Sequence, residues 1–207
     1  GRHEEALKYF NQAIELDPCC AEAWYSKGVV LDDMGRPKQA LKCFNRAIGL
    51  DPRDAMAWNN KGVVLVAMSR PQEALECFDQ AIALAQRYAA AWHNKGVALV
   101  RMGRYEEALK CFDRAIELDP RDAEVWHNKG VVLLIMRRRE ESLECFEQAI
   151  KINPRYSAAW CDKGQVLWYL NRYAEAMKAF EEADRLGDPN VRWVVAILPR
   201  KDTEGIF

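Results

Sequence analysis

Cysteine and histidine are the residues whose spacing first suggests chemistry in this sequence. Four of the seven cysteines recur every 34 residues, and a second position with the same interval carries His93, His127 and Cys161. Such series are typical of disulfide frameworks and metal sites, so disulfide bonding and metal binding are both candidate roles for these residues. No two cysteines form a CxxC pair, which weakens the zinc interpretation. The recurring cysteines are Cys43, Cys77, Cys111 and Cys145.

The regular interval itself argues against both kinds of chemistry. If each interval is one structural module, equivalent residues lie on different helices, and packed helix axes are about 8–10 Å apart. A disulfide needs Cα atoms within about 7 Å, and zinc ligands converge to about 2.0–2.3 Å from one ion. We therefore expect free, largely buried thiols in a reducing compartment, with no metal site and no cofactor.

Other catalytic chemistry is not indicated either. The 207 residues include only four serines, one threonine and three histidines, and no GxSxG, HExxH, P-loop or GxGxxG motif. The 30 basic and 31 acidic residues nearly cancel, so no global field favours nucleic acid. No apolar run approaches the roughly 20 residues of a membrane-spanning helix. The sequence predicts a cytoplasmic protein that is not an enzyme and has no nucleic-acid or membrane partner.

The interval of 34 residues governs most of the chain. Tryptophan, glycine, phenylalanine and alanine all recur at this spacing and in a constant phase. The series are Trp24, Trp58, Trp92, Trp126 and Trp160; Gly28, Gly62, Gly96, Gly130 and Gly164; Phe10, Phe44, Phe78, Phe112, Phe146 and Phe180; and Ala13, Ala47, Ala81, Ala115, Ala149 and Ala183. Each interval is therefore expected to be one structural module of a repeat protein.

Each module is predicted to form two helices joined by a tight turn. In residues 21–54, apolar and small residues follow three- and four-residue spacing on both sides of Gly35. Pro37 suits the first turn of a second helix, and Asp51-Pro52 ends it, because a residue before proline is disfavoured in helical geometry. Gly28 leaves room for the two helices to approach closely. We expect the tryptophans to fill the core beside Phe44, because burying one removes about 150–250 Å² from water.

The motif Trp24-x2-Lys27-Gly28-x2-Leu31, followed by Ala40, Phe44, Ala47 and Pro52, resembles the tetratricopeptide repeat (TPR). This resemblance implies an all-α, right-handed superhelical solenoid of antiparallel helix pairs. We expect the second helix of a truncated repeat in residues 1–20, with an apolar face at Leu7, Phe10 and Ile14 that lacks a partner. Five repeats are expected in residues 21–190, and a capping helix with a tail in 191–207, although Trp193 could instead dock into another molecule. The five repeats are 21–54, 55–88, 89–122, 123–156 and 157–190.

Departures from the family pattern leave some local geometry open. Ser69, Arg137 and Asn171 replace the turn glycine. Lysine stands where the family usually has leucine, and we expect its stem to pack while its ammonium reaches water. The run Arg137-Arg138-Arg139 falls on a turn, where exposed charge is ordinary.

In stacked helix pairs the first helices line the concave face, which is the usual binding surface of such solenoids. Their variable positions are apolar where a purely solvated face would be charged, and three successive repeats carry asparagine two residues after the tryptophan. Asparagine offers both a donor and an acceptor, so these side chains either pair with the backbone of a bound peptide or link neighbouring helices. The candidate peptide-binding residues are Asn60, Asn94, Asn128, Asn59, His93, His127, Val63, Val97, Val131, Leu134, Trp168 and Tyr25.

The asparagine series resembles the ladder inside the TPR superhelix of O-GlcNAc transferases, which implies a grip on an extended polypeptide. The TPR carboxylate clamp for chaperone tails is not expected, because Tyr25, Asn59 and His93 stand where it needs lysine. The sequence thus predicts a non-catalytic scaffold that binds a protein or peptide partner. The alternatives are a self-assembling structural protein, a possible homo-oligomer joined through exposed terminal helix faces, and a regulatory fragment of a larger enzyme.

Overall fold

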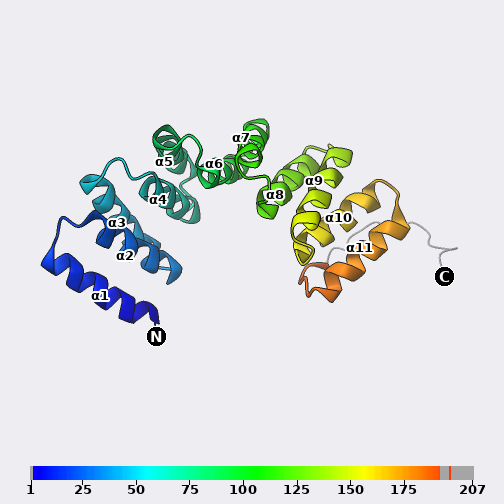
Figure 1. Cartoon of the computed structure of the whole chain (residues 1–207). Helices are drawn as coiled ribbons and strands as arrows, with labels where there is room; N and C mark the ends of the chain where they lie inside the picture. The colour runs from blue at the N-terminus through cyan, green and yellow to red at the C-terminus, as the bar shows by residue number, and fades with distance from the viewer. Residues whose placement is uncertain (1, 192–195, 197–207) are drawn as a thin grey trace. The chain divides into compact units, whose positions relative to one another are not determined.

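The computed structural model describes residues 2–191 and residue 196, and within them the chain forms helices and turns without a strand (Figure 1). It divides into two compact units, Gly1–Asp119 and Pro120–Phe207. The expected all-α architecture is therefore confirmed. Trp193 and most of the expected capping segment lie outside the described residues.

Unit 1 is a stack of helix pairs that follows a single leading helix. The pairs are α2 with α3, α4 with α5, and α6 with α7, and α1 packs against α2. The first helices α2, α4 and α6 contact one another in sequence, and α3 also packs on α4 and α5 on α6. The bounds are α1 Arg2–Leu16, α2 Ala21–Asp33, α3 Pro37–Leu50, α4 Ala55–Ala67, α5 Pro71–Leu84, α6 Ala89–Arg101 and α7 Tyr105–Leu118.

Unit 2 repeats this arrangement in its own two pairs. Helix α8 pairs with α9, α10 pairs with α11, and α9 and α8 both contact α10. The bounds are α8 Ala123–Ile135, α9 Arg139–Ile152, α10 Ser157–Tyr169 and α11 Tyr173–Arg185. Val191 follows α11 and is buried in the core of this unit.

The core of each pair is an interlock between a glycine on the first helix and a phenylalanine on the second. The phenylalanines of the five pairs are at most 2% exposed. A Cβ added at Gly62 would lie 2.5 Å from Cε1 of Phe78, and at Gly28 it would lie 2.8 Å from Cε1 of Phe44. The same contact recurs in the other three pairs. The ring therefore occupies the space that any side chain on the first helix would need, and the expected close approach at Gly28 is confirmed.

The turns within pairs share one backbone geometry, including those without glycine. Gly35 has φ 68°, and Ser69, Arg137 and Asn171 have φ of 59°, 63° and 61°. In the α2–α3 turn, the N–H of Gly35 donates to the oxygen of Asp32 and that of Arg36 to Leu31, which is the Schellman pattern. Non-glycine residues adopt this left-handed conformation at a cost of about 1–2 kcal/mol. The three departures therefore keep the turn geometry of the family at the expense of some stability.

Helix α1 is less open than the sequence suggests. Leu7 is 7% exposed and packs in the cluster that includes Leu31 and Phe44, while Phe10 and Ile14 are half-buried. The expectation that this face lacks a partner is wrong for Leu7, because α2 covers it within unit 1. Tyr9 and Leu16 are the large apolar side chains that α1 exposes.

Replacing Gly62 with alanine should destabilise the protein, because the new Cβ would collide with the fully buried ring of Phe78. We expect a loss of about 1–3 kcal/mol in the free energy of unfolding, even though alanine is intrinsically the better helix former by about 1 kcal/mol. Gly49→Ala is the matched control, because Gly49 is helical and nothing lies within 4 Å of an added Cβ. It should be neutral or stabilising. Urea unfolding measures both, and equal effects would contradict the interlock.

Candidate functional site

The first helices carry half-buried side chains, such as Asn60 and Val63 on α4, and we call the surface that these side chains form the uncovered face. The tryptophans of the same helices bond to the backbone of the preceding turns. Each indole is half-buried, and its N–H donates to the carbonyl of the residue six positions earlier, in the preceding turn. In α4, the Trp58 N–H lies 3.0 Å from the oxygen of Pro52. Trp24, Trp58 and Trp160 pack against the core clusters, as expected. The expectation of full burial is wrong, because each indole stays half-buried and bonds to the preceding turn.

The lysine that replaces the family leucine lies over the tryptophan ring of its own helix. Lys61 Nζ is 5.1 Å from the centre of the Trp58 ring, and the other four lysines of the series lie within 5.8 Å of theirs. This is a cation–π geometry. Lys95 also pairs with Asp79 and Lys163 with Glu147. The five lysines are half-buried, and their ammonium groups have specific partners.

The asparagines of unit 1 form a hydrogen-bonded row that links three first helices. Asn94 Nδ2 on α6 donates to Oδ1 of Asn59 on α4 at 3.0 Å. Asn59 Nδ2 donates to Asn60 Oδ1 at 3.1 Å, and Asn60 Nδ2 donates to the hydroxyl of Tyr25 on α2 at 2.9 Å. Asn59 is 4% exposed, whereas Tyr25, Asn60 and Asn94 are half-buried. These side chains therefore connect neighbouring repeats, which is one of the two roles considered for the asparagines.

Unit 2 uses the same positional rule with different residue types. His127 on α8 and Asp162 on α10 are separated in sequence by the same 35 residues as Asn60 and Tyr25. Nε2 of His127 lies 2.8 Å from Oδ2 of Asp162, and Nδ1 lies 3.2 Å from the Tyr156 hydroxyl. In both units, the residue that follows the tryptophan of one repeat contacts the residue that lies two positions after the tryptophan of the next repeat. Sequence reasoning noticed both positions but not their pairing.

Two of the candidate residues are covered. His93 is 8% exposed and its ring packs 6.0 Å from that of Phe112, so it lies beneath the surface together with Asn59. Cys161, at the equivalent position of α10, is 3% exposed. Direct contact of His93 and Asn59 with a ligand would require their neighbours to move.

The remaining candidates are half-buried on the first helices. Val63 and Val97 lie on α4 and α6 in unit 1. In unit 2, Val131, Leu134 and Asn128 lie on α8, and Trp168 on α10 packs edge-on against Tyr173 at 5.0 Å. Val131 and Leu134 line a hollow of about 530 Å³ in unit 2. Its other lining residues are Ile135, Arg137, Arg139, Asp162, Gln165 and Tyr169.

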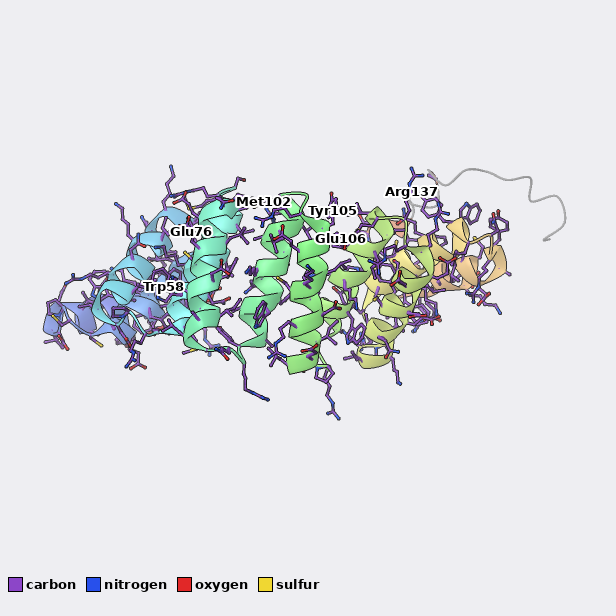
Figure 2. The ribbon with its side chains drawn as sticks, turned by 90° about the horizontal axis from the view of Figure 1, so that it is seen from above. Trp58, Glu76, Met102, Tyr105, Glu106 and Arg137 are labelled. Atoms are coloured by element: carbon purple, nitrogen blue, oxygen red, sulfur yellow. The ribbon has the colours of Figure 1, made fainter. Side chains whose placement is uncertain are left out.

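The arginines of this hollow were not among the residues predicted to bind. Arg139 begins α9, and its guanidinium lies over the ring of Tyr169 on α10, with 5.4 Å between Cζ and the ring centre. Figure 2 shows Arg137 at the edge of unit 2, in the turn that follows α8. The run of three arginines was the available signal, but an exposed turn is where such charge is commonly found.

All seven cysteines are free thiols, and burial divides them into two groups. Cys19 is exposed and Cys20 half-buried, whereas the other five are buried. Burial raises the pKa of Cys43 and Cys77, that of Cys111 to about 11 and that of Cys161 to about 12. These four thiols are therefore protonated and poorly reactive near neutral pH.

The described residues include neither a metal-binding cluster nor a helix that could cross a membrane. Between residues 2 and 191 and at 196, no three His, Cys, Asp or Glu side chains are grouped so that they could hold a metal ion. Over the same residues, no helix has both the length and the apolar content needed to span a bilayer.

The stacked helix pairs, with a Gly–Phe interlock in each and an uncovered face on the first helices, define a helical-repeat protein. The chain belongs to the tetratricopeptide repeat family. Residues 21–54, 55–88, 89–122 and 123–156 each match this family, and residues 157–186 and 1–33 match two further profiles with the same description. The resemblance drawn from the sequence is confirmed.

Solved structures of the same fold support this assignment. PilF of Pseudomonas aeruginosa superposes with a TM-score of 0.75 at 25% identity, covering 93% of this chain and 81% of that protein. MamA of Desulfovibrio magneticus RS-1 gives 0.72 at 19% identity, over 80% and 94%. YrrB, described as a TPR protein with an unusual peptide-binding site, gives 0.69 at 23% identity, over 90% and 97%. The all-α TPR solenoid fold is thus confirmed.

One relative is detected by sequence over a short stretch. The uncharacterized protein MJ0572 of Methanocaldococcus jannaschii is 50% identical over 36 residues, which is 17% of this chain and 42% of that protein. The match thus spans less than half of the relative. Membership of the TPR family is consistent with a protein-interaction scaffold.

Replacing Asn59 with alanine should destabilise unit 1, because it removes the acceptor of Asn94 and the donor to Asn60 from a buried position. We expect a loss of about 1–3 kcal/mol in the free energy of unfolding. Asn45→Ala, at an exposed site on α3, should stay within about 0.5 kcal/mol of wild type. Chemical unfolding of the two variants measures the difference. A harmless Asn59→Ala would show that the row is dispensable.

Only Cys19 and Cys20 should react rapidly with a thiol reagent at pH 8, because the buried thiols have a raised pKa and little thiolate. Ellman's reagent should titrate two of the seven thiols in the folded protein and all of them in urea. Peptide mapping identifies the sites. Fast labelling of Cys111 or Cys161 without denaturant would contradict this burial.

Proposed function

We propose that this protein is a non-catalytic scaffold that binds an extended segment of a partner polypeptide along the first helices of its repeats. The observation that carries the proposal is the pair of half-buried amide groups, Asn60 on α4 and Asn94 on α6, that belong to the hydrogen-bonded row. A valine lies one turn away from each of them on the same helix. The row combines polar groups that recognise backbone with apolar side chains that add contact area. YrrB, a protein of the same fold, carries a peptide-binding site, which is consistent with this use of the fold.

The hydrogen bonds of the row leave capacity for a ligand. An asparagine amide offers two N–H donors and two acceptor lone pairs. Asn60 uses one N–H toward Tyr25 and one lone pair toward Asn59. Its second N–H and lone pair match the C=O and N–H of a peptide backbone, which do not depend on sequence. The contacts between repeats would then hold each amide in a fixed orientation, which lowers the entropy lost on binding.

Apolar contacts supply the second part of the mechanism. Val63 and Val97 lie one turn or less from Asn60 and Asn94 on the same helices. Every CH₂-sized group buried by a ligand contributes about 0.8 kcal/mol, so apolar contacts spread over several repeats would add to the affinity that the amide hydrogen bonds provide. In unit 2, Val131, Leu134 and Trp168 have the same role. Asn128 supplies a polar group there, and His127, whose two ring nitrogens are bonded to Asp162 and Tyr156, would position its neighbours. The cytoplasmic location and the absence of catalysis remain predictions.

A random-peptide array tests this function. Wild-type protein should bind a subset of peptides, and the variant with Asn60, Asn94 and Asn128 changed to alanine should lose most of that binding. A second variant, Val63→Lys with Val97→Lys, leaves the asparagine hydrogen bonds in place and should also lose binding, because the lysines would charge an apolar surface. Circular dichroism checks that both variants stay helical.

The matched control carries three alanines at exposed polar sites on second helices, Asn45, Gln80 and Gln148. It should bind as wild type does. If wild type binds no peptide, or if the control loses as much binding as the groove variants, the first helices are not the binding face. Self-association would be the next explanation to examine, by measuring the molar mass with and without residues 189–207.

A further inference from the structure

The hollow in unit 2 differs in chemistry from the rest of the uncovered face. Three aliphatic side chains of α8 line one part of it, which we call its floor, and α10 contributes Asp162, Gln165 and Tyr169. The aliphatic side chains are Val131, Leu134 and Ile135. Ile135 is 49% exposed and Tyr169 is 39% exposed, which is high for large apolar side chains in a folded helix pair. Its volume of about 530 Å³ falls within the range of about 300–1,000 Å³ typical of ligand pockets.

Two guanidinium groups stand at the rim of this floor. Arg139 is stacked on Tyr169, and no ion pair within the described residues engages Arg137. Asp162 is the acidic lining residue, and its carboxylate is already bonded to His127. The hollow thus offers two positive groups to a ligand, against one carboxylate that has its own partner.

Arg138, which lies between these two arginines in the sequence, has a different role. Its guanidinium forms two hydrogen bonds of 2.6–2.7 Å with Glu141, and it does not line the hollow. The turns of unit 1 contain the same pair as Arg70 with Glu73 and Arg104 with Glu107. Arg138 therefore makes an ion pair that recurs from turn to turn, which we call the frame contact, whereas Arg137 and Arg139 are particular to this turn.

The corresponding positions of the other turns lack this chemistry. Where Arg137 and Arg139 stand, the turn of α6 and α7 has Gly103 and Tyr105, and that of α4 and α5 has Ser69 and Pro71. Arg137 also adopts a left-handed φ of 63°, which glycine would adopt with less strain. The cost of this residue is offset if its side chain contributes to binding.

We propose that this hollow binds an acidic peptide segment that inserts an apolar side chain onto Val131, Leu134 and Ile135 while its carboxylates pair with Arg137 and Arg139. The proposal deepens the proposed function and rests on it, since it assigns the class of peptide and the repeat that selects it. Guanidinium groups bind carboxylates through two parallel hydrogen bonds, and such contacts fix both position and orientation. The exposed aliphatic floor supplies the partner for the inserted side chain.

The composition of the hollow favours a peptide over a nucleic acid. Proteins that hold single strands stack successive bases on several aromatic rings, whereas Tyr169 is the one aromatic residue that lines this hollow. Three aliphatic side chains form its floor. The chain has a net charge of −1, so no wider positive field would attract a phosphate backbone.

Fluorescence anisotropy with synthetic peptides tests the proposal on the full chain. The acidic probe is a labelled peptide in which one Phe is flanked on both sides by Asp and Glu. A second probe has Lys at every acidic position, and a third has Ser in place of Phe. We expect wild-type protein to bind the acidic probe at least about tenfold more tightly than either of the others, because each of them loses one whole class of contact.

The variants separate the two arginines of the hollow from general charge. Arg137→Glu with Arg139→Glu should weaken binding of the acidic probe by at least about tenfold and should improve binding of the Lys probe. Arg138→Glu makes a charge change in the same turn but outside the hollow, and it should alter the dissociation constant by less than about twofold. An acidic residue at position 139 suits the first turn of α9, and circular dichroism and urea unfolding check that all variants stay folded.

Several outcomes would overturn the proposal. They are equal binding of the acidic and Lys probes, an Arg138→Glu effect as large as that of the double variant, or tighter binding of oligouridylate than of the acidic probe. The peptide array distinguishes this failure from failure of the proposed function. If wild type captures peptides that are not enriched in acidic and apolar residues, groove binding stands and the assignment of this hollow falls. If it captures none, both fall.

Discussion

The contact on which the structure depends is the one between a glycine of each first helix and a phenylalanine of the paired second helix. A Cβ at any of these five glycines would lie 2.5–2.8 Å from a ring carbon, closer than real Cβ atoms come. The ring and the missing side chain therefore fix where the two helices cross. Because this contact recurs in every pair, the face of the first helix that points away from the phenylalanine is also fixed.

That constraint explains why polar side chains meet between repeats at a constant offset. Tyr25 and Asn60, Asn59 and Asn94, and His127 and Asp162 are all separated by 35 residues, one more than the repeat length. Once the crossing of each pair is set, neighbouring first helices bring these two positions within hydrogen-bond distance. The residue types differ, yet each pair combines a donor with an acceptor. One geometry therefore accommodates several chemistries along the uncovered face.

The sequence predicted the repeated part of the fold because each repeated residue type has one physical reason to be there. Glycine at the crossing and phenylalanine in the core could be assigned from spacing alone. The tryptophans were placed too deep, because their size indicates burial but not the indole hydrogen bond to the preceding turn. The stacking of Arg139 on Tyr169 was missed, because the two residues lie on different helices and nearly one repeat apart. The 34-residue period predicts only those contacts that all repeats share. Contacts that occur in a single repeat cannot be predicted from it.

The hollow of unit 2 shows how a repeat acquires its own chemistry without a change of backbone. Arg137 takes the same left-handed turn conformation as Gly35 and Gly103, and Arg138 keeps the frame contact with a glutamate three residues later. The helices on either side retain their glycine and phenylalanine interlock. Substitutions at the positions that face outward from this frame therefore alter charge and apolar area while the fold is held by residues elsewhere. The chemistry that distinguishes one repeat from another therefore lies in the residues that depart from the 34-residue pattern.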